Sequence, residues 1–385
     1  MDRKTIVISA VNLVEAGPLA ILRECLSYLS LLAGEANYRV VAIVYKKELA
    51  DYPHIEYIET QWPKKRWINR LWYEYVSLGR ISEDLSPVQL WLSLHDTTPS
   101  VKAHFRAVYC HNAFSFYRWR FHDLLFAPKI ALFALFTKYI YATNIKKNNF
   151  LIVQQEWFKK GMSSMFGLDP ELIIVSPPQV KPFVHGIIGA NNGRSGKYTF
   201  LFAGSPNSHK NFEVICRAAA ILEKAGVHDF TVRITVKGTE NRYAKWLYRH
   251  WGHLNTIDFI GFVSRRRLED LYQESNCLIF PSKVETWGLP ISEFASLQKP
   301  MLLASLPYAE ETAGGSRFVA FFDPDCAEVL ASQMRKLVMG DISFLKPVPQ
   351  PAYNEPTATS WCELFSLLLT GDKSVHSTNK GIYDN

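Results

Sequence analysis

The sequence has few cysteines, and they are not placed to cross-link the chain. All six lie far apart and none forms a C-x-x-C pair: Cys25, Cys110, Cys216, Cys277, Cys326 and Cys362. Disulfide-rich secreted domains and structural zinc sites both need cysteines at close, paired spacings. The pattern argues against both and predicts a protein of a reducing cytoplasm.

Long apolar runs are missing as well. No stretch reaches the roughly 20 consecutive apolar residues with which a helix spans a bilayer. The N-terminus, MDRKTIVISAV, is a charged lead into a short strand and lacks the apolar core and cleavage site of a secretory signal. No internal repeat at a solenoid period is present. We therefore expect a cytoplasmic protein without a membrane span.

The composition that remains is globular and basic. The 385 residues are 48% hydrophobic and 21% charged, and a chain of this length is too long for one ordinary core and suits two domains. The net charge of +7 favours anionic partners such as phosphates, anionic lipids or nucleic acid. Nucleic acid is the weakest of these, because no recognised nucleic-acid module accompanies the charge.

The first half alternates apolar strands with polar loops, as in a doubly wound sheet, where ligands bind at the carboxyl ends of the strands. The expected strands are 5–11, 38–46 and 55–59, and the segments 88–97 and 105–114 are each expected to be a strand followed by a polar loop. Gly17 lies in the loop before a helix that opens at Pro18, where it either lets a ligand approach or serves a plain turn.

One histidine in this half is a candidate functional residue. His111 follows the strand that ends at Cys110, and His95 and Asp96 are weaker candidates at the neighbouring strand end. A lone histidine more often has a structural role, but a strand's carboxyl end in this fold faces the ligand.

The second half contains an acidic stretch, FPSKVETWGLPISEFASL (280–297), in which Glu285 and Glu293 stand eight positions apart. Pro290 suits the first position of a helix, so the Trp-Gly-Leu-Pro turn presents unpaired backbone N–H groups, a ready anion site. One carboxylate would then contact sugar hydroxyls and the other a ribose. The alternative is that Glu285 complements the helix dipole and Glu293 is solvated.

This stretch resembles the nucleotide-sugar signature of the family 4 retaining glycosyltransferases. Glu285 and Glu293 meet the family's Glu-x7-Glu pattern, and residues 285–290 meet its lead-in. The likeness continues through 200–212, 257–282 and 299–324. The resemblance implies an α/β GT-B fold: two Rossmann-like doubly wound domains face across a cleft, and a C-terminal helix crosses back to the first.

The resemblance implies four segments with expected boundaries. An acceptor-binding domain would span 1–180 and a nucleotide-sugar-binding domain 181–352, with a linker near 178–197. A crossover helix would lie in 353–371, and residues 372–385 would form a disordered tail.

The resemblance also implies roles for single residues. Glu285 would hold the hexose hydroxyls, Glu293 the ribose, and His111 would contact the donor hexose, so His111, Lys210 and Glu285 are the expected catalytic residues. The expected donor-binding residues are Gly17, Gly204, Ser205, His209, Lys210, Asn211, Gly238, Val263, Glu285, Thr286, Trp287, Gly288, Leu289 and Glu293. The triplet Arg265-Arg266-Arg267 is expected to be a solvated helix start.

The phosphate clamp departs from the family pattern of Gly-Arg followed by Lys. Gly204 and Lys210 fit, but Ser205 replaces the arginine, and we expect His209 and Asn211 to take over part of the task. A lysine and a helix dipole would stabilise the leaving diphosphate, so neither a divalent metal nor a cofactor is expected. We find no evident Asp-x-Asp metal motif.

Two basic aromatic stretches, 62–75 and 114–147, have the composition of membrane-surface helices, with rings at headgroup level and cations on anionic lipid. The alternative for 114–147 is a hydrophobic helix packed under the sheet.

The expected function is transfer of a hexose, with retention, from a nucleoside-diphosphate sugar to a lipid-linked glycan in bacterial O-antigen or capsule assembly. A GDP-mannose-like donor is favoured, and UDP-hexoses remain open. Two alternatives are a non-catalytic nucleotide-binding subunit, suggested by Ser205, and a GT-B sugar-nucleotide epimerase.

Overall fold

The computed structural model describes residues 3–118, 121–179 and 196–371. The chain forms two compact units. The first comprises Met1–Ser115, Phe136–Gln179 and Tyr353–Asn385, and the second comprises Phe116–Leu135 and Val180–Ala352. The predicted tail and most of the predicted linker lie outside the described residues.

The first unit is built on a parallel sheet of seven strands in the order β3-β2-β1-β4-β5-β6-β7. The strands are β1 (Lys4–Ser9), β2 (Tyr38–Val44), β3 (Ile55–Glu59), β4 (Val88–Ser93), β5 (Phe105–Tyr109), β6 (Phe150–Val153) and β7 (Ile173–Val175). The chain order reverses between β1 and β4, which pair directly. Such a switch point opens a crevice at the carboxyl ends of the strands.

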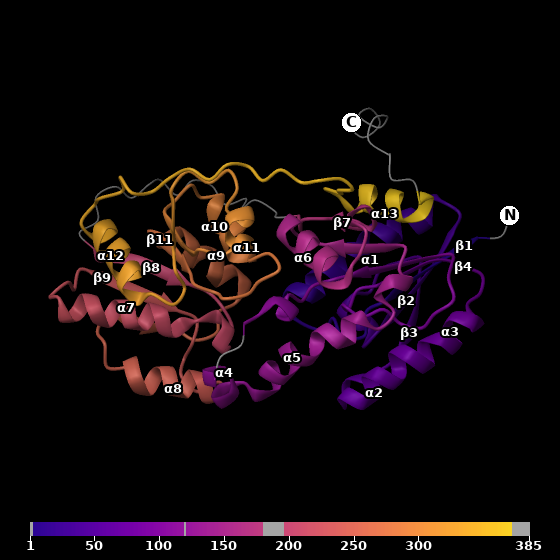
Figure 1. Ribbon diagram of the computed structural model, residues 1–385, viewed down its shortest axis with the longest axis horizontal. Helices are drawn as coiled ribbons and strands as arrows, with labels where there is room; N and C mark the ends of the chain where they lie inside the picture. The colour runs from indigo at the N-terminus through magenta and orange to yellow at the C-terminus, as the bar shows by residue number, and fades with distance from the viewer. Residues whose placement is uncertain (1–2, 119–120, 180–195, 372–385) are drawn as a thin grey trace. The chain divides into compact units, whose positions relative to one another are not determined.

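Both faces of this sheet are covered, because its strands are apolar on both sides. On β1, Ile6 and Ile8 pack on one side with α1 (Ala16–Glu35) and α13 (Trp361–Thr370), and Val7 packs on the other side in a separate cluster. Figure 1 shows the yellow α13 among the indigo and violet elements of this unit. The remaining helices are α2 (Trp67–Trp72), the π-helical turn η3 (Tyr73–Ser77), α3 (Leu78–Asp84), α5 (Pro128–Ala142), which starts in the second unit, and α6 (Glu156–Phe166).

The second unit has a parallel sheet of six strands in the order β10-β9-β8-β11-β12-β13. The strands are β8 (Tyr198–Phe202), β9 (Phe230–Ile234), β10 (Ile257–Phe259), β11 (Cys277–Phe280), β12 (Met301–Ala304) and β13 (Val319–Phe322). The helices are α4 (Phe121–Phe126), α7 (Phe212–Lys224), α8 (Arg242–Trp251), α9 (Arg265–Glu274), α10 (Leu289–Ala295), α11 (Pro307–Thr312) and α12 (Ala327–Val338). Here the order reverses between β8 and β11, so the two sheets share the same doubly wound logic.

Short 3-10 turns complete the described chain. They are η1 (Lys47–Leu49), η2 (Trp62–Lys64), η4 (Phe114–Phe116), η5 (Ile145–Lys147), η6 (Pro170–Leu172) and η7 (Ser208–Lys210). Within the described ranges, no helix is long and apolar enough to cross a membrane.

One segment differs from the predicted boundary at residue 180. Residues 116–135 precede it in the sequence but belong to the second unit. The cause is aromatic packing: the Phe126 ring lies 5.7 Å from Tyr243 and 5.1 Å from Trp246, both on α8. Figure 1 shows the violet α4 beside α8. The aromatic composition of 114–147 does not indicate which of the two sheets its helices join.

Candidate functional site

The site is assembled from loops at the carboxyl ends of β8 and β11, which pair at the switch point of the second sheet. The loop after β8 carries Gly204 and then η7, which ends at Lys210. The loop after β11 carries Glu285 and leads into α10. Adjacent parallel strands bring their following loops to the same edge, so residues far apart in sequence meet there.

Lys210 and Glu285 form an ion pair at this edge. Lys210 Nζ lies 2.5 Å from Glu285 Oε1, and the two side chains are 18% and 15% exposed. Lys210 Nζ also lies 6.0 Å from the centre of the Phe280 ring. A cation and a carboxylate kept largely from water interact more strongly than an exposed pair.

Asn211 holds three loops together. It has a left-handed backbone (φ 60°), which asparagine tolerates better than most residues. Its Nδ2 donates to the carbonyls of Pro281 and Pro324, which follow β11 and β13. The backbone N–H of Lys283 donates to the His209 carbonyl at 2.8 Å. Asn211 therefore fixes the loops around Lys210, and its own amide contacts protein groups.

His209 is buried beside the neighbouring lysine. Burial and the adjacent Lys210 charge lower the pKa of His209 to about 3, so its imidazole is neutral at physiological pH. The ring of Tyr117 lies 6.4 Å from it, edge to face. A neutral, buried imidazole cannot supply the positive charge of the missing arginine.

The backbone at the start of the loop after β8 packs closely against neighbouring side chains. The Gly204 N–H donates to Thr235 Oγ1 at 2.8 Å, and a Cβ on Gly204 would lie 3.3 Å from the Phe202 ring. Ser205 Oγ accepts from Asn207 Nδ2 at 2.9 Å. Ser205 is thus part of a local polar turn.

The loop after β9 forms a small anion-binding nest that is filled by its own chain. Gly238 has φ 94°, and the backbone N–H groups of Lys237, Gly238 and Thr239 all donate to the Glu240 carboxylate. Successive N–H groups in such a turn favour anions. Val263 lies two residues after Gly261, in the loop that follows β10.

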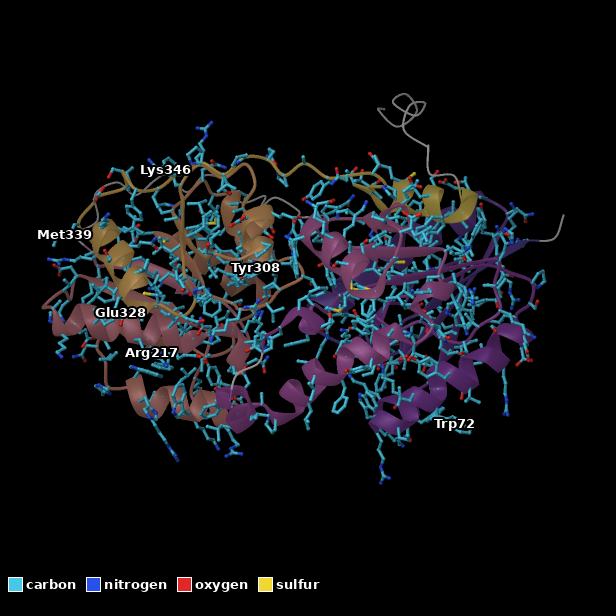
Figure 2. All side chains as sticks on the ribbon, in the orientation of Figure 1. Trp72, Arg217, Tyr308, Glu328, Met339 and Lys346 are labelled. Atoms are coloured by element: carbon cyan, nitrogen blue, oxygen red, sulfur yellow. The ribbon has the colours of Figure 1, made fainter. Side chains whose placement is uncertain are left out.

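The turn from Thr286 to Leu289 is held from both sides. Gly288 has φ 88°, which suits glycine, and caps α10, so the helix begins at Leu289 and Pro290 takes its second position. Trp287 Nε1 donates to Ser292 Oγ at 3.1 Å, and the Trp287 carbonyl accepts from Thr312 Oγ1. Nearby Tyr308, labelled in Figure 2, donates to the Ser282 carbonyl at 2.6 Å.

Glu293 is buried, with 6% of the residue exposed, and is held by two side chains. Arg265 Nη1 lies 2.5 Å from its Oε1, and Tyr272 donates its OH to Oε2 at 2.8 Å. Arg265 does begin α9, and its side chain is 56% exposed, as expected of a solvated helix start, but its guanidinium also contacts Glu293, which was not predicted. Arg267 instead pairs with Glu274 on its own helix at 2.6 Å. No sequence pattern signals the Arg265 contact, because 28 residues separate it from Glu293.

His111 belongs to the first unit and lies at the end of β5. Its ring stacks on Tyr109 with centroids 4.4 Å apart, and burial lowers its pKa to about 3. Its backbone N–H donates to Asp96 Oδ1 at 2.5 Å. Asp96 has φ 68° and is buried, which raises its pKa to about 6. Asp96 therefore fixes the His111 backbone.

A charged network adjoins these residues at the β1–β4 switch point. His95 contacts Ser9 Oγ at 2.8 Å through Nε2 and lies 3.5 Å from Glu74 Oε1 through Nδ1. Arg70 donates to the same Glu74 oxygen at 2.8 Å and to the His95 carbonyl at 3.0 Å. Sequence reasoning missed Arg70 and Glu74, because it treated 62–75 only as a surface stretch.

Gly17 lies inside the first turn of α1, since that helix begins at Ala16 and not at Pro18. Its backbone is therefore part of a helix N-terminus that follows β1. The loop predicted at this position is in fact the first turn of the helix.

The chain does contain an Asp-x-Asp sequence that sequence reasoning overlooked: Asp323-Pro324-Asp325, which follows β13. Asp323 Oδ1 accepts from the Asp325 N–H at 2.9 Å, and Asp325 lies 3.4 Å from Lys283 Nζ. Asp325 also lines a cavity of about 120 Å³ with Arg217, which Figure 2 labels. Across residues 3–118, 121–179 and 196–371, no three His, Cys, Asp or Glu side chains are grouped to hold a metal ion.

Comparison with known proteins bears on this site. Residues 187–343, less than half of the chain, match the family described as "Glycosyl transferases group 1". The matched region includes Lys210, Glu285 and Glu293. No curated protein matches the chain.

Solved structures match over nearly the whole chain. The lipopolysaccharide outer core galactosyltransferase WaaB, in its apo form, has 10% identity and a TM-score of 0.61, covering 88% of this chain and 91% of that one. WaaG, a glycosyltransferase involved in lipopolysaccharide biosynthesis, has 14% identity and a TM-score of 0.61, covering 88% and 92%. HepE from Anabaena, in complex with UDP and glucose, has 12% identity and a TM-score of 0.60, covering 89% and 92%.

These identities are low, so the structural matches speak to the fold. Together with the two parallel sheets they confirm the predicted GT-B fold. The family match places a glycosyl transferases group 1 domain over the second unit's site and supports a glycosyltransferase.

Proposed function

We propose that the chain is a retaining hexosyltransferase that uses a nucleoside-diphosphate sugar. The observation that carries this proposal is the Lys210–Glu285 pair, 2.5 Å apart at the switch point of the second sheet and inside the family match. The same edge of the sheet holds the buried carboxylate of Glu293. A diphosphate needs a cation, a hexose needs acceptors for its hydroxyls, and a ribose needs a third polar group.

The proposed chemistry uses these charges in sequence. As the bond from C1 to the donor oxygen breaks, C1 bonds to the acceptor's hydroxyl oxygen, whose proton passes to the leaving diphosphate, and Lys210 stabilises the negative charge that builds on that diphosphate. When the donor binds, before this bond breaks, Glu285 exchanges part of its contact with Lys210 for hexose hydroxyls. Asn211 keeps the lysine loop in place while this happens. His111 of the first unit contacts the hexose as a neutral imidazole, a role that rests on the sequence resemblance.

The favoured donor is a GDP-hexose such as GDP-mannose, and the acceptor is a lipid-linked glycan of a bacterial O-antigen or capsule. The donor base and the acceptor rest on the sequence resemblance. A thermal-shift screen of GDP- and UDP-sugars tests the donor, because a ligand that binds the folded state raises its melting temperature. Slow hydrolysis of the stabilising sugar nucleotide, in the presence of EDTA, tests a metal-independent reaction. No stabilisation by any member would refute the proposal.

A second candidate is a non-catalytic nucleotide-binding subunit. Ser205 stands where the family pattern has arginine, and the buried His209 has a lowered pKa and carries no compensating charge. A protein that binds a nucleotide sugar but never hydrolyses or transfers it would favour this candidate. Replacing Ser205 with Arg would then restore a cation to the loop, and activity gained by S205R would identify the lost group.

A surface of the first unit fits an anionic membrane. Four large apolar side chains of η2 and α2 are exposed: Trp62 (39%), Trp67 (50%), Ile68 (65%) and Trp72 (60%). Figure 2 labels Trp72, which lies on α2. The exposed cations Lys64, Lys65 and Arg66 lie between these rings in the sequence. Rings with interleaved cations suit a headgroup layer, which would bring a lipid-linked acceptor to the enzyme.

A further inference from the structure

The contacts of Glu293 lead to a residue that the proposed function does not use. Glu293 is a carboxylate on a short helix, and only 6% of the residue is exposed. A buried charge is costly unless it is paired and hydrogen-bonded. Among the residues that the structure describes, each carboxylate oxygen has one donor: Arg265 on Oε1 at 2.5 Å and Tyr272 on Oε2 at 2.8 Å.

These two donors use about half of the carboxylate's capacity to accept hydrogen bonds. An ionised carboxylate accepts about four hydrogen bonds, two on each oxygen. Arg265 and Tyr272 account for one on each oxygen, so both oxygens retain a lone pair for a ligand. The two hydroxyls of a ribose are vicinal and can donate side by side to one carboxylate. The arrangement therefore suits a diol better than a single hydroxyl.

Arg265 is itself held in place. Its Nε donates to Glu269 Oε1 at 2.9 Å, one turn further along α9, while Nη1 contacts Glu293. The guanidinium thus bridges two carboxylates with a fixed planar fork, a geometry that lysine does not reproduce. Its side chain is 56% exposed, whereas that of Glu293 is 7% exposed. The arginine connects the buried acid to the surface of the unit.

The loop before Arg265 also faces outward. Phe262 is 93% exposed and follows Gly261, whose φ is 74°. Ser264 caps α9 by accepting the Arg267 N–H at 3.3 Å, which sets the start of the helix at Arg265. The first residue of α9 is therefore positioned by its own cap, and its side chain reaches α10.

We propose that Arg265 is a positioning residue for nucleotide recognition: it orients the Glu293 carboxylate so that both oxygens accept the ribose diol of the donor. This inference rests on the proposed function, in which Glu293 binds the ribose. Arg265 acts through Glu293, and Tyr272 supports the other oxygen. Loss of Arg265 should therefore reduce discrimination for the ribose hydroxyls more than binding of the base and diphosphate.

The test measures binding of GDP and 2′-deoxy-GDP, with UDP and 2′-deoxy-UDP in parallel, by calorimetry on the full chain. For the wild type we expect the ribonucleotide to bind roughly tenfold or more tightly than its deoxy form, the range of a hydrogen bond to a charged group. In R265M this ratio should fall below about threefold, with the affinity for the deoxy form nearly unchanged. R265Q, which keeps a neutral donor, should give an intermediate ratio.

R267M is the matched control, because Arg267 lies on the same helix and pairs with Glu274 away from Glu293. It should keep the wild-type ratio. If R265M leaves Glu293 too costly to bury and the protein does not fold, R265Q carries the test, since it keeps Tyr272 and a neutral donor on Glu293.

Comparing R265M and R265Q with E293Q distinguishes failure of the proposed role of Arg265 from failure of the proposed role of Glu293. If E293Q loses the discrimination but R265M and R265Q keep it in full, Arg265 does not position Glu293 and the inference is overturned. If E293Q itself keeps the discrimination, Glu293 does not bind the ribose, and the proposed role of that carboxylate falls first. Equal loss of affinity for both forms in R265M would overturn the inference too, because Arg265 would then contact another part of the nucleotide or only stabilise the fold.

Discussion

Lys210 Nζ and Glu285 Oε1 are 2.5 Å apart although 75 residues separate them in the chain. Neither residue lies in a strand. They meet because β8 and β11 are neighbours in the sheet and each residue follows one of these strands. A sugar nucleotide that binds at this edge would find a cation already aligned and a carboxylate that can be shared.

Removing the Lys210 charge should lower the turnover rate much more than it lowers the free energy of unfolding. K210M is expected to lower kcat for donor hydrolysis or transfer by roughly 10²–10³, the cost of losing one group aimed at developing charge. Steady-state kinetics with the donor found by thermal shift measures the effect. K224M, at the exposed end of α7, is the control. Equal rates in K210M and the wild type would contradict the assignment of Lys210.

Asp96 should make stability depend on pH with an unusual sign. Burial raises its pKa from 3.8 to about 6, so the folded protein favours the protonated form. Stability from this group is complete below pH 3.8 and is lost as the pH rises through about 6. Between pH 4 and 7 the wild type should lose up to about 3 kcal/mol of unfolding free energy relative to D96N.

Urea unfolding of both proteins at several pH values gives this difference. D258N, at an exposed position of β10, should run parallel to the wild type. Parallel curves for D96N and the wild type would mean that Asp96 ionises normally.

His111 should stay neutral between about pH 5 and 8. Its pKa is lowered from 6.5 to about 3 by burial, so the folded state disfavours the imidazolium and loses stability as the pH falls below 6.5. Histidine ring signals in NMR spectra, assigned with H111Q, should show no titration of His111 between about pH 5 and 8, the range in which an unperturbed imidazole changes charge. A midpoint for His111 within that range would refute the buried, neutral imidazole.

The exposed rings of α2 should bind anionic vesicles together with the adjacent cations. In flotation with phosphatidylglycerol-containing liposomes, W67S/W72S should lose apolar insertion, and K64Q/K65Q/R66Q should lose the salt-sensitive part of binding. M339S removes an exposed apolar side chain after α12 and should bind like the wild type. Absence of the wild-type protein from the floated fraction at low salt would rule out this surface as a membrane contact.

Sequence patterns predict the fold well because they report burial directly. Runs such as TIVISAV are apolar on both sides and form central parallel strands, and the polar residues after them mark the carboxyl edges. The same logic predicts that Lys210 and Glu285 share one edge. It needs only the strand order, which a doubly wound sheet largely dictates.

Side-chain contacts between helices could not be predicted from the apolar pattern of the sequence. Arg265 is one of three consecutive arginines, and nothing in their order distinguishes the one that contacts Glu293 from the one that pairs with Glu274. Arg70 and Glu74 lie one turn apart in a stretch that looks like a surface helix, yet Glu74 is only 2% exposed and contacts His95. Such side-chain geometry depends on tertiary packing, which periodicity does not report.

The packing of Phe126 on α8 has a practical consequence for dissecting the protein. Cutting the chain at residue 180 would leave a bare aromatic patch at Tyr243 and Trp246 on the carboxyl-terminal fragment, and the Phe126 ring would be stranded on the other fragment. Fragment 181–352 expressed alone should therefore aggregate more readily than one to which residues 116–135 are tethered by a flexible linker. The second unit is thus built from two segments of the chain that are separated in the sequence.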